Sequence, residues 1–205
     1  MKFDTLFLLI DYVILSKNKL NQLWNQENRL EPINYRKRMV CDIEKDSNIW
    51  ENIVKYRSFL SIHQLDIVSE ITKMQDEKNI INARIKQLNS IQYKYHKYLT
   101  GNLNGKSAIN KCFNDLFGMR IIIDEVFDYD EIKCEVCRKY PDLKIINADK
   151  DSYYATHIYF QENNYVFPWE LQIWEKCKED GNLKSHNAYK QDYVRWESEL
   201  KNKEV

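Results

Sequence analysis

Two stretches of the chain place a carboxylate beside an apolar, β-branched run. Asp115 precedes Arg120 and the run Ile121–Ile123, and Glu170 lies within the run Trp169–Trp174. Such runs predict two buried strands, each offering an acid to the same region. Mg²⁺ takes oxygen ligands, usually one or two protein carboxylates together with substrate phosphates. The two acids therefore predict a magnesium-dependent site for phosphate transfer.

Strand alternation puts Glu170, Gln172 and Trp174 on one face of the second run. A buried glutamate in mid-strand is costly unless it is paired or bound to a metal. The alternative to a functional role is a salt bridge to a core arginine such as Arg120. The residues alone leave both interpretations open.

Tyr153, His157 and Tyr159 occupy alternate positions of a further predicted strand, so we expect them to share a face. These strands can bring an acid pair, a tyrosine, a histidine and an arginine to one pocket. Aromatic packing is the alternative interpretation of Tyr153 and His157. The histidines at 63 and 96 fall on predicted helices, where we expect surface or boundary positions.

A second polar group consists of Arg84, Lys86, Ser90 and Lys94, which we place on one predicted helix. Residues four apart lie on the same helix face. Lysines and a hydroxyl in a row suit a polyphosphate chain, and an arginine can fork a phosphate or stack on a base. The alternative is an ordinary solvated helix face.

Hydrophobic spacing predicts a helical N-terminal region, residues 1–79, followed by a mixed α+β domain, residues 80–205. An apolar stripe of Ile81, Ile85, Leu88 and Ile91 favours helix through this boundary. The expected helices are 4–28, 47–60, 62–99 with a break near 77–79, 106–114, 128–139 and 176–200. The expected strands are 119–124, 143–147, 153–161 and 169–174. The fold class is therefore α+β, with a mixed β-sheet flanked by helices.

Composition narrows the function classes. The 205 residues carry 31 basic and 31 acidic side chains, so no global positive charge argues for nucleic-acid binding. A local basic cluster at Arg36–Arg38 leaves a polyanion-binding face open. The apolar run Leu6–Ile10 is too short to span a membrane and is a poor signal peptide.

The five cysteines are an odd set in a chain without a secretory signal, which indicates reduced thiols in a cytoplasmic protein. Cys134 and Cys137 have the spacing of a zinc pair. Neither a second pair nor a nearby histidine accompanies them, so a structural role on one helix face is favoured.

Four motifs, between about residues 81 and 193, resemble the synthetase domain of RelA/SpoT-type alarmone synthetases. The family's basic helix motif corresponds to Arg84, Lys86, Ser90 and Lys94. Its strand-entry motif corresponds to Asp115, Gly118 and Arg120, and its Glu-x-Gln-Ile strand corresponds to Glu170, Gln172 and Ile173. Its closing helix corresponds to His186, Tyr189 and Lys190.

The resemblance implies a nucleotidyltransferase-like fold and an ATP-dependent pyrophosphokinase that releases AMP. By this analogy Arg84, Lys86, Ser90, Lys94 and Arg120 bind ATP. Asp115 and Glu170 are catalytic and hold Mg²⁺, with Glu170 also activating the acceptor hydroxyl, and Tyr153, His157 and Gln172 bind the acceptor.

The acceptor segment Ser152–His157 departs from the family's Gly-Tyr-Arg-Ser-Leu-His, and Trp174 replaces an arginine. A guanosine nucleotide, GDP or GTP, is the first acceptor that the resemblance implies. The departures keep a toxin acting on the 3′ end of tRNA as an alternative, with Arg36–Arg38, Lys94 and Lys97 as an RNA track and an antitoxin protein as a partner. A catalytically inactive nucleotide- or partner-sensing module is the third possibility.

Overall fold

The computed structural model describes residues 3–201, without the side chains of residues 189, 190, 197 and 199–201. Five strands form one mixed sheet in the order β1-β2-β5-β4-β3. They are β1 (Asn79–Ile85), β2 (Phe117–Ile123), β3 (Lys144–Asn147), β4 (Thr156–Phe160) and β5 (Trp169–Glu175). The central strands β2 and β5 run parallel, and the other neighbours run antiparallel. This confirms the expected α+β class with a mixed sheet.

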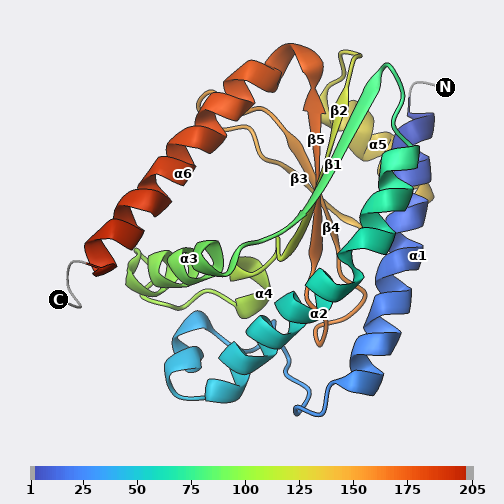
Figure 1. Ribbon diagram of the computed structural model, residues 1–205. Helices are drawn as coiled ribbons and strands as arrows, with labels where there is room; N and C mark the ends of the chain where they lie inside the picture. Colours follow the sequence, from blue (N-terminus) through green and yellow to red (C-terminus); the bar gives the residue numbers. More distant parts are fainter. Residues whose placement is uncertain (1–2, 202–205) are drawn as a thin grey trace.

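Helices stand on both sides of the sheet (Figure 1). On one face lie α1 (Asp4–Glu27), α2 (Ser47–Lys73) and α5 (Tyr129–Lys139). On the other side, α3 (Leu88–Thr100) and α6 (Glu179–Lys201) approach each other at their far ends. The short elements η1 (Val40–Glu44), α4 (Ile109–Cys112) and η2 (Lys176–Lys178) lie in the connections.

The face of the sheet that meets α1 and α2 is apolar. Trp169 packs on Phe117 with ring centroids 4.5 Å apart, and its indole N–H donates to the Tyr56 hydroxyl over 2.9 Å. Leu171 and Ile173 are fully buried on the same face. One continuous hydrophobic cluster joins the N-terminal helices to the strands. Alternation then sends Glu170 and Gln172 to the opposite face, away from this core.

The helix expected over residues 62–99 is wrong only in its middle part. Residues 62–73 and 88–99 are helical, but the break expected near residues 77–79 is longer and contains a strand. Helix α2 runs without a break from Ser47 to Lys73, and residues 79–85 form the edge strand β1. Between α2 and β1 the carboxylate of Asp76 accepts hydrogen bonds from the backbone N–H groups of Lys78 and Asn79 at 2.8 and 2.7 Å, which stabilises a turn in place of a further helical turn. The apolar spacing of four between Ile81 and Ile85 fits a helix, but an even spacing also keeps one face of a strand.

The remaining elements differ from expectation mainly at their ends. The helices expected at 4–28 and 128–139 are confirmed as α1 and α5. The helix expected at 106–114 is reduced to Ile109–Cys112, and the strand expected from Tyr153 begins at Thr156. None of the helices in residues 3–201 combines the length and apolarity that crossing a membrane requires.

Candidate active site

A cavity of about 800 Å³ opens between the polar face of the sheet and the helices α3 and α6. All the predicted site residues except Arg120 line it: Arg84, Lys86, Ser90, Lys94, Asp115, Tyr153, His157, Glu170 and Gln172. Arg120 lines a smaller pocket of about 90 Å³, which shares Arg84, Asp115, Glu170 and Gln172 with the first. The structure therefore brings these predicted residues together around one cavity.

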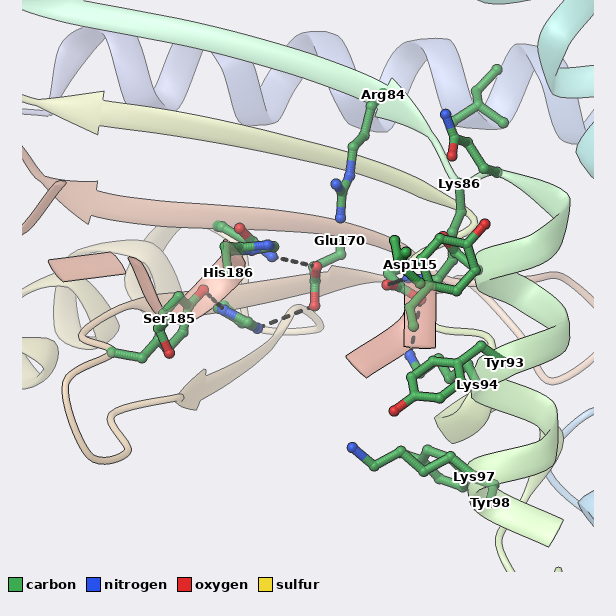
Figure 2. A pocket seen from close by; sticks show the side chains of 18 residues that line it. Arg84, Lys86, Tyr93, Lys94, Lys97, Tyr98, Asp115, Glu170, Ser185 and His186 are labelled. Atoms are coloured by element: carbon green, nitrogen blue, oxygen red, sulfur yellow. Dashed lines mark hydrogen bonds and ion pairs between the residues drawn. The ribbon is translucent and has the colours of Figure 1, made fainter. Parts of the chain in front are cut away.

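The basic residues reach the cavity from three elements, not from the single helix face that we expected. Arg84 lies on β1, Lys86 lies in the connection after it, and Ser90 and Lys94 lie on α3. The backbone N–H of Lys86 donates to the Leu116 carbonyl over 2.9 Å, which fixes this connection beside the start of β2. Figure 2 shows Arg84 extending toward Glu170, with Lys86 and Lys94 on either side of Asp115.

Asp115 is held by two lysines. Its Oδ2 lies 2.6 Å from Lys86 Nζ, and its Oδ1 lies 2.9 Å from Lys94 Nζ. Lys94 also donates to the side-chain carbonyl of Asn114 over 2.9 Å. Burial alone would raise the pKa of Asp115, but the charges and hydrogen bonds of the two lysines outweigh it and hold this pKa far below its usual value. Asp115 is therefore a fixed anion.

Glu170 is buried, with 7% of its surface exposed, and hydrogen bonds satisfy it. Its Oε1 accepts from the Tyr159 hydroxyl at 2.9 Å and lies 3.1 Å from His157 Nδ1. Its Oε2 accepts from the Gln172 amide at 2.9 Å. Burial raises the pKa of Glu170, but its hydrogen bond with His157 offsets this and the pKa lies below its usual value. The partner of Glu170 is thus His157, not the core arginine that the sequence left open.

Arg120 forms an ion pair with neither Asp115 nor Glu170 but contacts three other side chains, those of Trp174, Gln172 and His186. Its guanidinium carbon lies 3.5 Å from the centroid of the Trp174 ring, and its N–H groups donate to Gln172 Oε1 at 3.1 and 3.3 Å. The same guanidinium lies 3.1 Å from His186 Nε2. Burial lowers the pKa of Arg120 to about 10, which leaves it charged at neutral pH. In this arrangement Arg120 links β2, β5 and α6 and holds Gln172 beside Glu170.

Tyr153 and His157 are part of the same polar network, which goes beyond simple aromatic packing. The Tyr153 hydroxyl lies 2.9 Å from His157 Nε2 and accepts from the indole N–H of Trp174 over 3.3 Å. The strand register brings His157 opposite Gln172 and Tyr159 opposite Glu170. His157 therefore reaches the Glu170 carboxylate from β4, and Tyr153, from the segment before β4, is linked to it through His157.

The donor set fits Mg²⁺ with few protein ligands. The described part of the chain contains no group of three or more His, Cys, Asp or Glu side chains placed to hold a metal. Cys134 and Cys137 therefore belong to no such group. A carboxylate has about four lone-pair sites. Each oxygen of Asp115 and Oε2 of Glu170 therefore still has a site left after its contacts above. Two carboxylates completed by phosphate and water are the usual surroundings of Mg²⁺ in such enzymes.

Some residues at or beside the cavity had no predicted role in the site. Tyr159, which donates to Glu170, was expected only to share a face with His157, and His186 was named only as part of the closing-helix motif. Tyr93 and Tyr193 line the cavity from α3 and α6, with ring centroids 6.0 Å apart. Only tertiary structure brings these two helices together. The side chains of the other closing-motif residues, Tyr189 and Lys190, lie outside the described residues.

No protein-family model and no curated protein matches the chain. Solved structures do. The small alarmone synthetase 1 from Bacillus subtilis is 16% identical, with a TM-score of 0.43 over 77% of this chain and 88% of that one. The same enzyme bound to its product pppGpp is 17% identical, with a TM-score of 0.41 over 77% of this chain and 96% of that one. A GTP pyrophosphokinase family protein from Streptococcus pneumoniae is 18% identical, with a TM-score of 0.40 over 72% of this chain and 84% of that one.

These solved structures carry the name of the family that the four sequence motifs resemble. Their identities are below 20% and their TM-scores below 0.5. We therefore base the function on the residues of the cavity described above.

Proposed function

We propose that this chain is an ATP-dependent pyrophosphokinase, which moves the β,γ-pyrophosphate of ATP to the 3′-hydroxyl of a guanosine nucleotide and releases AMP. One observation carries the proposal. Two carboxylates, Asp115 and Glu170, share a cavity with Arg84, Lys86 and Lys94. Transfer of phosphoryl-type groups depends mostly on positioning and charge neutralisation, which cationic side chains and a metal-binding acid pair supply.

The donor side of the site is the part built around Asp115. Lys86 and Lys94 together bring one positive charge more than Asp115 neutralises, and Arg84 adds a second on β1. A polyphosphate chain would satisfy these cations, with Ser90 as a further hydrogen-bond donor. Mg²⁺, held by Asp115 and Glu170, would neutralise charge on the transferring group when bound. Arg120 serves this site by holding Gln172.

The acceptor side is the part around Glu170, where Tyr153, His157 and Gln172 lie. An aromatic ring such as that of Tyr153 can stack on a nucleobase. His157 Nδ1 lies 3.1 Å from Glu170 Oε1, so the two side chains form one hydrogen-bonded unit that an acceptor hydroxyl can approach from the cavity. A guanosine nucleotide is the first acceptor to test, because it is the acceptor that the resemblance of the four sequence motifs implies.

The test offers γ-labelled ATP and Mg²⁺ with GDP, GTP or bulk deacylated tRNA in parallel. We expect label to move to GDP or GTP with release of AMP. The variant Glu170→Gln should lose transfer by at least about 100-fold, as the removal of a positioned acid–base group typically does. Absence of transfer to every acceptor would contradict the proposal and favour a nucleotide- or partner-sensing module.

The matched control is Glu175→Gln on the same strand. Glu175 accepts the backbone N–H of Phe127 at 2.9 Å and does not line the cavity. An amide oxygen can still accept this bond, so we expect full transfer activity. Equal losses in Glu170→Gln and Glu175→Gln would point to damaged folding of β5 and not to lost chemistry.

The 3′ end of tRNA is the second candidate acceptor, because aromatic and basic side chains line one wall of the cavity. Tyr93 and Lys97 come from α3 and Tyr193 from α6. Trp196 continues this wall, with its ring 5.4 Å from that of Tyr93. Alternating aromatic and cationic side chains suit single-stranded nucleic acid. Label on tRNA with none on GDP or GTP would select this candidate, for which the predicted neutralising partner protein also becomes relevant.

A further inference from the structure

A chain of hydrogen bonds runs from Trp174 through Tyr153 and His157 to Glu170. The indole N–H of Trp174 reaches the Tyr153 hydroxyl over 3.3 Å, and this hydroxyl lies 2.9 Å from His157 Nε2. The other ring nitrogen, Nδ1, lies 3.1 Å from Glu170 Oε1. The imidazole is thus engaged on both sides, by a carboxylate and by a hydroxyl.

The direction of each bond follows from the groups involved. An ionised carboxylate only accepts, so the proton of a neutral His157 ring is on Nδ1. Nε2 then presents a lone pair to Tyr153. Because the indole N–H of Trp174 only donates, the Tyr153 oxygen accepts from it and gives its own proton to Nε2. Burial raises the pKa of Tyr153 to about 12, so the phenol keeps the proton that it donates.

This order of groups is the one that activates a hydroxyl. A carboxylate holds one nitrogen of an imidazole, and the other nitrogen receives the proton of the reacting hydroxyl. Here the buried phenol of Tyr153 occupies the place of that hydroxyl. Tyr153, His157 and Glu170 all line the large cavity, so an acceptor entering it meets this position.

We infer that the acceptor hydroxyl takes the place of the Tyr153 hydroxyl on His157 Nε2 and gives its proton to that nitrogen. The inference rests on the proposed pyrophosphate transfer. As the acceptor oxygen forms its bond to the β-phosphorus, the bond from this phosphorus to the bridging oxygen of AMP breaks and AMP leaves with the electron pair. The proton stays on His157, and the carboxylate of Glu170 stabilises the imidazolium.

Glu170 is better placed to orient His157 than to take the proton itself. Its Oε1 already accepts from Tyr159 and His157, at 2.9 and 3.1 Å. Its Oε2 accepts from Gln172, and Glu170 also lines the smaller pocket together with Asp115 and Arg84. One oxygen therefore fixes the base, and the other stays available to the donor side of the cavity.

Chemical rescue tests the role of His157 directly. The variant His157→Ala should transfer pyrophosphate about 100-fold to 10,000-fold more slowly than the wild type. Millimolar imidazole should raise the rate of this variant at least about tenfold by filling the space of the lost ring. The control His63→Ala removes a ring that packs on Phe59 outside the cavity, so imidazole should leave its rate unchanged. Transfer that is lost without rescue, or that survives the substitution, would overturn the inference.

The variant Tyr153→Phe tests the displaced hydroxyl. It keeps the ring for stacking but removes the group that competes for His157 Nε2. Loss of one competing hydrogen bond should raise kcat/KM for the acceptor by about twofold to tenfold, with kcat/KM for ATP changed less. A fall in kcat/KM for the acceptor would mean that the hydroxyl assists the acceptor, which contradicts the inference.

The tautomer of His157 gives a test that needs no turnover. The chain contains only 4 histidines, so ¹⁵N resonances of the imidazoles can be assigned by single substitutions. We expect His157 to carry its proton on Nδ1, and a proton on Nε2 in the neutral ring would overturn the inference. If the wild type transfers pyrophosphate but His157→Ala is not rescued, only this inference fails. If the wild type transfers to no acceptor, the proposed function fails.

Discussion

At the scale of single residues, the cavity keeps its charges in two groups that differ in sign. Asp115 with Lys86 and Lys94 carries a net positive charge, whereas Glu170 accepts hydrogen bonds from neutral donors such as Tyr159 and Gln172. Electrostatics therefore separates a half that attracts polyphosphate from a half that orients an acceptor. Removing the carboxylate of Asp115 should therefore lower stability, and removing that of Glu170 should lower transfer activity.

Replacing Asp115 by Asn should destabilise the fold, because two largely buried ammonium groups would lose their common anion. We expect the free energy of unfolding to fall by about 3 kcal/mol in urea titrations. The double variant Asp115→Asn/Lys86→Met should recover part of this loss. Asp46→Asn is the control, since its partner Arg38 is 47% exposed and such surface pairs contribute about 1 kcal/mol or less.

The same carboxylate predicts how stability depends on pH. The pKa of Asp115 is lowered in the folded chain, so its contribution is complete above its unfolded value, near pH 4, and is lost as the pH falls toward the folded value. Urea midpoints of wild type and Asp115→Asn should therefore differ most at neutral pH and converge below about pH 4. A difference that grows with acid would contradict this sign.

At the scale of elements, the sequence located the acids better than it located the strand beside them. Asp115 and Glu170 were correctly placed at buried strands, since β-branched runs and alternation are local signals. Strand β1 was missed because Ile81 and Ile85 are four residues apart, a spacing that fits one face of a helix and also one face of a strand. Only its pairing with β2, which sets Ile81 against Ile121, decides between them.

The partner of Glu170 was equally hidden from the sequence. Antiparallel pairing of β4 with β5 sets Tyr159 opposite Glu170 and His157 opposite Gln172. A shift of one residue would have turned His157 to the other face of the sheet. The register depends on contacts between distant segments, so the types of the site residues were predictable while their hydrogen bonds were not.

Helix α1 is attached to the connection between β4 and β5 by an ion pair whose lysine is buried. Lys17 Nζ lies 2.7 Å from Glu162 Oε2, with the lysine side chain fully buried and the glutamate 35% exposed. We expect Glu162→Gln to lower the free energy of unfolding by about 2 kcal/mol, because it leaves a buried ammonium without its anion. Thermal or urea unfolding measures this change.

Two further variants separate the charge effect from packing around α1. The double variant Lys17→Met/Glu162→Gln removes the buried charge as well and should lie within about 1 kcal/mol of the wild type. Asp11→Asn, whose pair with Lys139 is about half exposed on both sides, should change stability little. A double variant as unstable as Glu162→Gln would show that the aliphatic packing of Lys17 matters more than its charge.

At the scale of the whole molecule, stability and chemistry occupy opposite faces of one sheet. The core joins α1, α2 and the strands in a single cluster, so the helical N-terminal region contributes directly to the fold that carries the site. On the cavity side α3 and α6 approach each other away from the sheet (Figure 1), where the ring of Tyr93 contacts those of Tyr193 and Trp196. Helix α3 also reaches the core through Ile91, whereas no described apolar side chain of α6 is buried, so α6 is the more lightly attached part of the cavity wall.

This difference predicts that α6 can be loosened without unfolding the sheet. Trp196 on α6 lies 5.4 Å from the Tyr93 ring and 5.7 Å from the His96 ring of α3, measured between centroids. Aromatic pairs contribute about 0.5–1.5 kcal/mol each beyond buried area. Trp196→Ala should therefore raise the KM for ATP by about tenfold and increase amide hydrogen exchange in α6, while exchange in the central strands stays slow.

Trp50→Ala is the matched control for this last prediction. Trp50 contacts α3 from the other side, with its ring 5.5 Å from that of Tyr95, and it does not line the cavity. Its removal should lower the unfolding midpoint with little change in the KM for ATP. If both tryptophan variants raise this KM equally, the position of α3 governs nucleotide binding. If neither does, the contact between α3 and α6 does not hold the nucleotide-binding wall in place.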